Sequence, residues 1–362
     1  MSRSKTDAMI PGTLWEQVRR RRMKTLAVIG MTKNTGKTVA LNHLLACAAQ
    51  AGVDTGVTSV GRDGEEHDQV FFIAKPPVLV RSGSVVATAR DTLLRSRVGW
   101  KLLAQTGVDS PMGEILIVRA LQHGAMEIAG ASRGSDQQQI IAHLQQFGCA
   151  LVLLDGALGR SHHASPALAD GMVLATGAAL GGGVHDVIRK TRDRLAILGI
   201  PAADTAIVRL CSEVFAKGGV GIWDHAGVAV FRAEMATLNA ASTLLGLADR
   251  QFGTLAVSGA VGKALWRAIG TLLERHPGLT LVVADGTKLF IEQADVAAFR
   301  QRGGKLLAYR RINIVGITLN PFSPLGGHFV AEELLDAARR AFPAYPVTDV
   351  MLEHAFTTTG VS

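Results

Sequence analysis

A candidate phosphate-binding site lies near the start of the chain, where Gly36, Lys37 and Thr38 follow a short apolar run. The run from Thr25 to Gly30 (TLAVIG) predicts a buried strand, and the residues after the triplet (VALNHLLACAAQ) predict an amphipathic helix. A strand that turns into a helix directs backbone N–H groups and the positive end of the helix dipole at one point. Because these groups suit a polyphosphate, we predict that this loop binds the phosphates of a nucleotide.

Each residue of the triplet has an expected role. Lys37 is expected to lie against the β- and γ-phosphates, and the Thr38 hydroxyl is expected to ligate Mg²⁺. Gly36 lets the backbone approach a phosphate oxygen because it has no Cβ. These contacts are with phosphates and not with a base, so the predicted ligand is ATP or GTP. The predicted nucleotide-binding residues are consecutive: Thr32, Lys33, Asn34, Thr35, Gly36, Lys37, Thr38 and Val39.

A candidate metal-binding acid follows a second apolar run, which begins at Ala150 and ends at Asp155. This pattern predicts a central strand that delivers one carboxylate to the edge of the sheet where the loop lies. We expect Asp155 to hold Mg²⁺ directly or through water, and to act with Lys37 as the catalytic pair. The loop continues through residues 160–163 (RSHH), which we expect to face the γ-phosphate or a substrate, with exposure to solvent as the alternative.

An acidic loop offers a further metal ligand. Residues 54–60 predict a second strand, and residues 61–69 (GRDGEEHDQ) follow it. Asp63 lies nearest the end of that strand and is the acid that we expect to ligate Mg²⁺. A solvated turn explains the same residues equally well.

The spacing of the phosphate loop carries a resemblance to known families. Five residues separate Gly30 from Gly36, where the usual loop has four, so Met31 stands in place of the first glycine. This spacing resembles that of dethiobiotin synthetase and the cobyric acid synthase group, and TKNTGKT is similar to the loop of the molybdopterin-guanine-dinucleotide accessory proteins. The resemblance implies a P-loop NTPase of the SIMIBI class with a mostly parallel sheet.

Two other residues are similar to positions of those families. Lys75, in a Lys-Pro pair, is similar to the dethiobiotin synthetase lysine that lies by the reacting groups, although it falls later in this chain. Asn320 ends the run GITLN and resembles the asparagine that contacts the base in this class. It lies far beyond the place that this role requires, which favours a turn-forming Asn-Pro pair.

The order of these patterns predicts three segments. Residues 1–24 form a basic N-terminal segment, residues 25–203 an α/β P-loop NTPase domain, and residues 204–362 a second α/β domain. In the first domain, residues 71–89 predict a hairpin because two β-branched runs flank an Arg-Ser-Gly turn. In the second, residues 206–210 (AIVRL) predict a strand.

Charge and composition bear on the partners that we expect. The formal net charge is +8, and five cations precede the first predicted strand: Arg19, Arg20, Arg21, Arg22 and Lys24. Only 5% of the residues are aromatic and no nucleic-acid-binding motif occurs, so nucleic acid is not an expected partner. The cations predict a solvated helix end, with an acidic partner or an anionic surface as the alternative.

No uncharged apolar run reaches the roughly 18 residues of a membrane helix, and the N-terminal residues lack the apolar core of a signal peptide. Cys47, Cys149 and Cys211 are isolated, which predicts reduced core thiols. We therefore expect a cytoplasmic protein without a membrane partner.

A wider set of motifs resembles one accessory protein family. SVGRDGE, AKPPVLVRSG, DGALGRS, ADGTKLFI and GITLNPFSP look like the reactivase subunit that accompanies adenosylcobalamin-dependent lysine 5,6-aminomutase. This resemblance implies an accessory factor that couples nucleotide binding and hydrolysis to remodelling of the aminomutase, together with a second ATPase subunit. The alternative is a ligase of the dethiobiotin synthetase type, which activates a small carboxylate or carbamate.

Overall fold

The computed structural model describes residues 12–59, 77–157, 165–324 and 326–352. The chain divides into two compact units. The first unit comprises residues 1–189 and 314–362, and the second comprises residues 190–313. The boundary at residue 189 falls inside one continuous helix, α5 (Val184–Leu198).

The first unit contains a sheet of nine described strands, in the order β16-β15-β9-β1-β8-β2-β4-β6-β5. The strands from β16 to β4 are parallel, and β6 and β5 are antiparallel additions at one side. The strands are β1 (Thr25–Gly30), β2 (Thr55–Ser59), β4 (Val85–Ala89), β5 (Trp100–Ser110), β6 (Gly113–Ala120), β8 (Leu151–Ala157), β9 (Gly171–Gly177), β15 (Ile314–Asn320) and β16 (Val347–Thr348).

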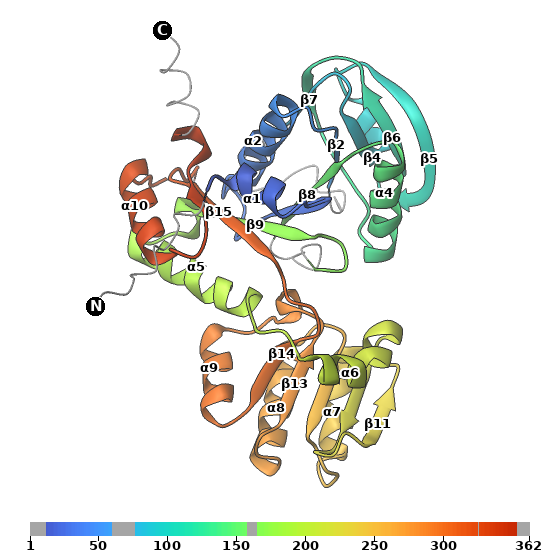
Figure 1. Cartoon of the computed structure of the whole chain (residues 1–362), viewed down its shortest axis with the longest axis vertical. Helices are drawn as coiled ribbons and strands as arrows, with labels where there is room; N and C mark the ends of the chain where they lie inside the picture. The colour runs from blue at the N-terminus through green and yellow to red at the C-terminus, as the bar shows by residue number, and fades with distance from the viewer. Residues whose placement is uncertain (1–11, 60–76, 158–164, 325, 353–362) are drawn as a thin grey trace, which may run out of the picture. The chain divides into compact units, whose positions relative to one another are not determined.

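Helices pack on both faces of this sheet (Figure 1). On one face, Leu41 and Leu44 of α2 pack in a core with Leu153 of β8. On the other face, a Cβ added to Gly56 of β2 would lie 3.1 Å from Cβ of Leu144 in α4, so the helix lies close to the strand. The helices are α1 (Leu14–Arg20), α2 (Lys37–Gln50), α3 (Arg90–Leu94), α4 (Gly134–Gln146), α5 and α10 (Ala331–Ala341); a small separate sheet pairs β3 (Val78–Val80) with β7 (Gly124–Met126).

The second unit has its own mixed sheet, in the order β11-β10-β12-β13-β14. Its core includes Phe252, Leu255 and Ile269, all 0% exposed. The strands are β10 (Val220–Trp223), β11 (Ala229–Ala233), β12 (Thr254–Val257), β13 (Thr280–Val283) and β14 (Lys305–Ala308), and the helices are α6 (Thr205–Lys217), α7 (Ala240–Gly246), α8 (Lys263–Arg275) and α9 (Gln293–Gln301). Both units are therefore α/β, and the sheet of the first unit is mostly parallel.

The structure corrects the segment boundaries predicted from the sequence. Residues 204–362 do not form one domain, because β15 returns to the first unit and pairs with β9. The predicted domain of residues 25–203 therefore ends too late and lacks two of its strands. The N-terminal segment 1–24 is not separate either, since Leu14, Val18 and Met23 are buried in the core of the first unit.

Two predicted elements are also wrong. Strands β3 and β4 do not pair as a hairpin; β3 pairs with β7, and β4 lies between β2 and β6. Residues 206–210 belong to α6, which Asp204 caps by accepting a hydrogen bond from the Ile207 amide at 2.9 Å. In both cases, a short run of β-branched residues was consistent with more than one pairing or conformation.

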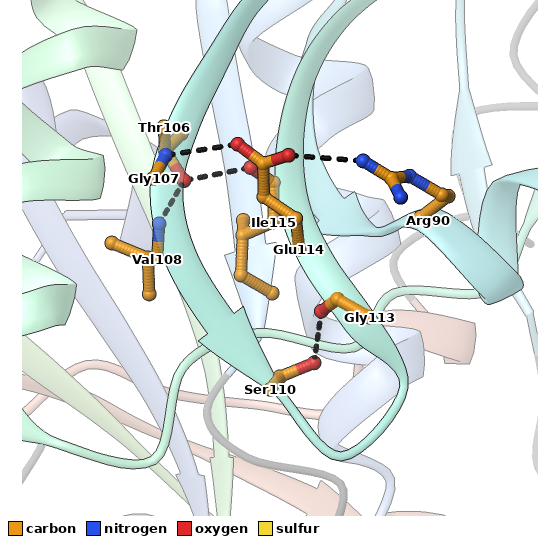
Figure 2. Close-up of polar contacts among 8 residues, drawn as sticks. All are labelled: Arg90, Thr106, Gly107, Val108, Ser110, Gly113, Glu114 and Ile115. Carbon is orange, nitrogen blue, oxygen red and sulfur yellow. Dashed lines mark hydrogen bonds and ion pairs between the residues drawn. The ribbon is translucent and has the colours of Figure 1, made fainter.

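The hairpin of the first unit is β5–β6, and β5 forms the long curved edge of the sheet (Figure 1). Figure 2 shows how Glu114 of β6 holds it: one carboxylate oxygen accepts from the Gly107 amide at 2.9 Å and the other pairs with Arg90 at 3.0 Å. The pairing register shifts between Gln105 and Asp109, and Gly107 has φ +70°. This bulge interrupts the edge strand, which limits pairing with another chain.

We predict that Glu114→Ala destabilises the first unit by about 1 kcal/mol, because the Gly107 amide and Arg90 lose a charged acceptor that is partly exposed to solvent. Asp109→Ala is the matched control, since Asp109 faces Glu114 in the register and is exposed. Urea denaturation should show a lower midpoint for Glu114→Ala alone. Equal midpoints for the two variants would show that Glu114 does not hold the bulge.

Candidate functional site

The loop between β1 and α2 has a defined backbone conformation. Asn34 and Gly36 both adopt left-handed conformations, with φ +63° and +83°. The Thr35 hydroxyl donates to the Thr32 carbonyl at 3.0 Å, and Thr35 is buried. The eight residues from Thr32 to Val39 thus form one compact turn and the start of α2, as expected from the sequence.

Gly30 allows Lys37 to fold back over the end of β1. A Cβ at Gly30 would lie 2.4 Å from Thr35 Oγ1 and 2.5 Å from Lys37 Cγ, so only glycine fits there. Met31, which replaces the usual first glycine, donates its amide to the Ala175 carbonyl of β9 at 2.9 Å. The longer loop is therefore fixed at its start by the neighbouring strand.

The N-terminus of α2 presents donors at the carboxyl edge of the sheet. Gly36 is its N-cap and has no side chain to cap the helix. Ala40 donates to the Gly36 carbonyl at 2.9 Å, and the amides of the preceding turn have no acceptor within the helix, as at any helix start. Such a terminus favours an anion.

Asp155 lies on the strand next to β1 and on the face that α2 covers. It pairs in register with Val28 of β1 and with Ser59 of β2. Side chains alternate along a strand, and Leu153 of β8 packs in the same core as α2, so Asp155 faces the same side. Asp155 is 4% exposed and Thr38, in the first turn of α2, is 5% exposed. The carboxylate and the hydroxyl thus lie on one side of two adjacent strands.

Asn320 contacts the loop, although its position late in the chain favoured only a turn-forming Asn-Pro pair. Its Nδ2 donates to the Asn34 carbonyl of the loop at 2.8 Å, across 286 residues of chain. Its Oδ1 accepts from the Phe322 amide at 3.1 Å, which is the turn expected of an Asn-Pro pair. A Cβ added to Gly36 would lie 3.1 Å from Asn320 Cβ. The end of β15 therefore supports the loop directly.

The signal for Asn320 was present in the sequence as a strand ending in asparagine. Its distance from the loop along the chain is due to the second unit, which is inserted between α5 and β15. With the insertion removed, β15 follows β9 as the next strand of the sheet.

Several expected site residues lie outside the described residues: Asp63, Lys75, Arg160, Ser161, His162 and His163. Within the described ranges, no group of three or more His, Cys, Asp or Glu side chains could hold a metal ion. A magnesium site of the expected kind takes few protein ligands, because phosphate oxygens and waters supply the rest.

Two cysteines of the chain are poor nucleophiles. Burial raises the pKa of Cys149 to about 11 and that of Cys211 to about 12. Both side chains are buried, as expected of core thiols, whereas Cys47 is only partly buried and does not fit that expectation fully.

Comparison of the chain with protein-family models, with curated proteins and with solved structures finds no match. No helix in the described ranges is both long and apolar enough to cross a membrane.

We predict that Gly36→Ala destabilises the protein more than Gly52→Ala does, by about 1 kcal/mol or more. Both glycines have positive φ, so both variants carry the strain of a left-handed alanine. The added Cβ of Gly52 meets nothing within 4 Å, whereas that of Gly36 presses on Asn320. Thermal unfolding of the two variants checks this. Equal losses of stability would mean that the Asn320 side chain moves aside without destabilising the protein.

Proposed function

We propose that this chain is a Mg-nucleotide-binding P-loop NTPase that binds ATP or GTP at residues 32–39. The observation that carries the proposal is the arrangement of Lys37, Thr38 and Asp155 around the end of β1. Lys37 folds over Gly30, and Thr38 and Asp155 are buried on the same side of two adjacent strands. The strand order also reverses at β1. Strands β8 and β2 lie on one side of β1, and the chain then crosses to β9 on the other side. Such a switch point is where open α/β sheets bind ligands.

The residues present fit a magnesium ion. A hydroxyl and a carboxylate are hard oxygen ligands, which Mg²⁺ prefers, and Thr38 and Asp155 supply one of each. Bound Mg²⁺ would neutralise charge on the phosphates during transfer. Lys37 would hold the β- and γ-phosphates by charge, the first amides of α2 would orient their oxygens, and Asp155 would position the metal or its water.

We further propose that hydrolysis serves a protein partner. Two contacts link the loop to strands that flank the inserted unit in the chain. The Met31 amide donates to β9, which leads into α5, and Asn320, the last residue of the strand that follows the inserted unit, donates to the Asn34 carbonyl. A change at the loop on nucleotide binding is thereby passed to both connections of the inserted unit. The proposed role is an accessory factor that remodels an enzyme, and the motif resemblance points to adenosylcobalamin-dependent lysine 5,6-aminomutase with a second ATPase subunit.

We predict that Mg-ATP or Mg-GTP raises the melting temperature, because a ligand at about 100 times its dissociation constant stabilises the folded state by about 2.7 kcal/mol. Lys37→Ala should weaken nucleotide binding about 10- to 100-fold, since it removes a charged contact to phosphate. Asp155→Asn should keep most of the binding but lose hydrolysis and magnesium dependence. Thermal melts and phosphate release measure these effects.

Lys263→Ala is the control for Lys37→Ala, because Lys263 also begins a helix after a glycine. It should leave the nucleotide-induced shift unchanged. If millimolar ATP or GTP does not change the melting temperature of the wild-type protein, nucleotide binding is refuted. If Asp155→Asn hydrolyses nucleotide at the wild-type rate, Asp155 has only a structural role. Turnover that begins only when a small carboxylate is added would favour the ligase.

We predict that the protein binds a cobalamin-dependent aminomutase differently with and without nucleotide. A tenfold difference in affinity corresponds to about 1.4 kcal/mol of coupling. Pull-down of the purified aminomutase with and without Mg-ATP measures it, and Asn320→Ala should reduce the difference by loosening the link to β15. Absence of binding in both states would exclude this partner while leaving nucleotide binding intact.

A further inference from the structure

Ser59 is the last residue of β2, and it lies beside Asp155. The two residues are the final pair of the β2–β8 ladder, although β8 continues to Ala157. Side chains alternate along a strand, and Val57, two residues before Ser59, packs in the core that α2 covers. Ser59 therefore projects to the same face as Asp155, and it is 5% exposed.

A hydrogen bond joins the Ser59 side chain to the backbone of Asp155. The Ser59 hydroxyl donates to the Asp155 carbonyl at 3.4 Å. This is long for an O–H···O bond, so we expect it to add little to the free energy of folding. The bond nevertheless ties the end of β2 to the residue whose carboxylate is the expected magnesium ligand.

The segment that leads into α4 holds the backbone of Ser59. It crosses the ends of two strands at the carboxyl edge: Ala129 donates its amide to Thr88 Oγ1 of β4 at 2.9 Å and accepts from the Ala89 amide. A Cβ added to Gly130 would lie 1.7 Å from the Ser59 carbonyl oxygen, so the two backbones touch. Ser59 therefore has little room to move, and its hydroxyl is a fixed point for the neighbouring strand.

We propose that Ser59 is a positioning residue for Asp155. Its hydroxyl holds the Asp155 peptide where the β2–β8 ladder ends, so the carboxylate keeps its orientation on the side of Thr38. Groups that hydrogen-bond to a metal-ligating residue orient it, and their removal lowers metal affinity. This inference rests on the proposed function, because it concerns the acid assigned there to Mg²⁺.

Titration with Mg²⁺ at a saturating concentration of ATP or GTP tests this role. The readout is the magnesium-dependent part of the rise in melting temperature, with nucleotide in EDTA as the baseline. Ser59→Ala should need about 5- to 10-fold more Mg²⁺ for half of that rise and should keep the rise that nucleotide gives in EDTA. Without ligand it should melt within about 2 °C of the wild-type protein, since only one long hydrogen bond is lost.

Hydrolysis gives a second readout. Ser59→Ala should lower kcat more than it raises KM, because the loop that binds the phosphates is unchanged. Ser59→Thr keeps the hydroxyl and should restore the wild-type magnesium requirement. If Ser59→Ala fails to fold, Ser59→Cys replaces it, because its thiol is a weaker donor on a side chain of similar size, and it should show the same increase.

Thr55→Val is the matched control. It removes a buried hydroxyl from the same face of β2 at the amino edge, where Thr55 pairs with Leu151, and it should leave the magnesium requirement unchanged. A wild-type requirement in Ser59→Ala, an equal increase in Thr55→Val, or failure of Ser59→Thr to restore the requirement would each overturn the proposal. No rise of the wild-type melting temperature with nucleotide would instead refute the proposed function, and the role of Ser59 with it.

Discussion

The placement of β1 between β8 and β9 is the constraint on which the candidate nucleotide site depends. Hydrogen bonding to β8 sets Asp155 level with Val28, and hydrogen bonding to β9 continues past the strand end, where Met31 donates to Ala175. A shift of one residue in the β1–β8 register would turn Asp155 to the opposite face of the sheet, away from Thr38. The positions of the side chains proposed to bind nucleotide and metal therefore depend on the register of β1 with β8 and with β9.

The return of the chain at β15 completes this arrangement. Gly177 ends β9 with φ +153°, and a Cβ there would lie 1.9 Å from the Asn320 carbonyl oxygen, so the ends of β9 and β15 meet closely. Asn320 then reaches the loop at Asn34. The inserted unit lies between α5 and β15 in the chain, and β9 and β15 still pair as neighbouring strands of the first sheet.

The carboxyl edge of the sheet carries two helix starts of different design. That of α2 is approached by a lysine, a threonine and a neighbouring carboxylate, which together suit a phosphate and a metal. That of α4 has no side-chain cap and carries the buried Gln137 in its first turn. The two turns lie over opposite faces of the sheet.

The sequence by itself determined the local units. The strand 25–30, the loop and α2 were predictable because apolar periodicity, a glycine and the GKT triplet act within about twenty residues. The strand that carries Asp155 was predictable in the same way, although β8 continues two residues further, to Ala157. Only the tertiary structure decided that β15 joins the first sheet, that β3 and β4 do not form a hairpin, and that residues 206–210 are helical. Strand pairing depends on contacts between distant segments, and a short apolar run is compatible with several partners. For the same reason, the burial of Gln137 and the contact between Asn320 and Asn34 became visible only once the strands were placed.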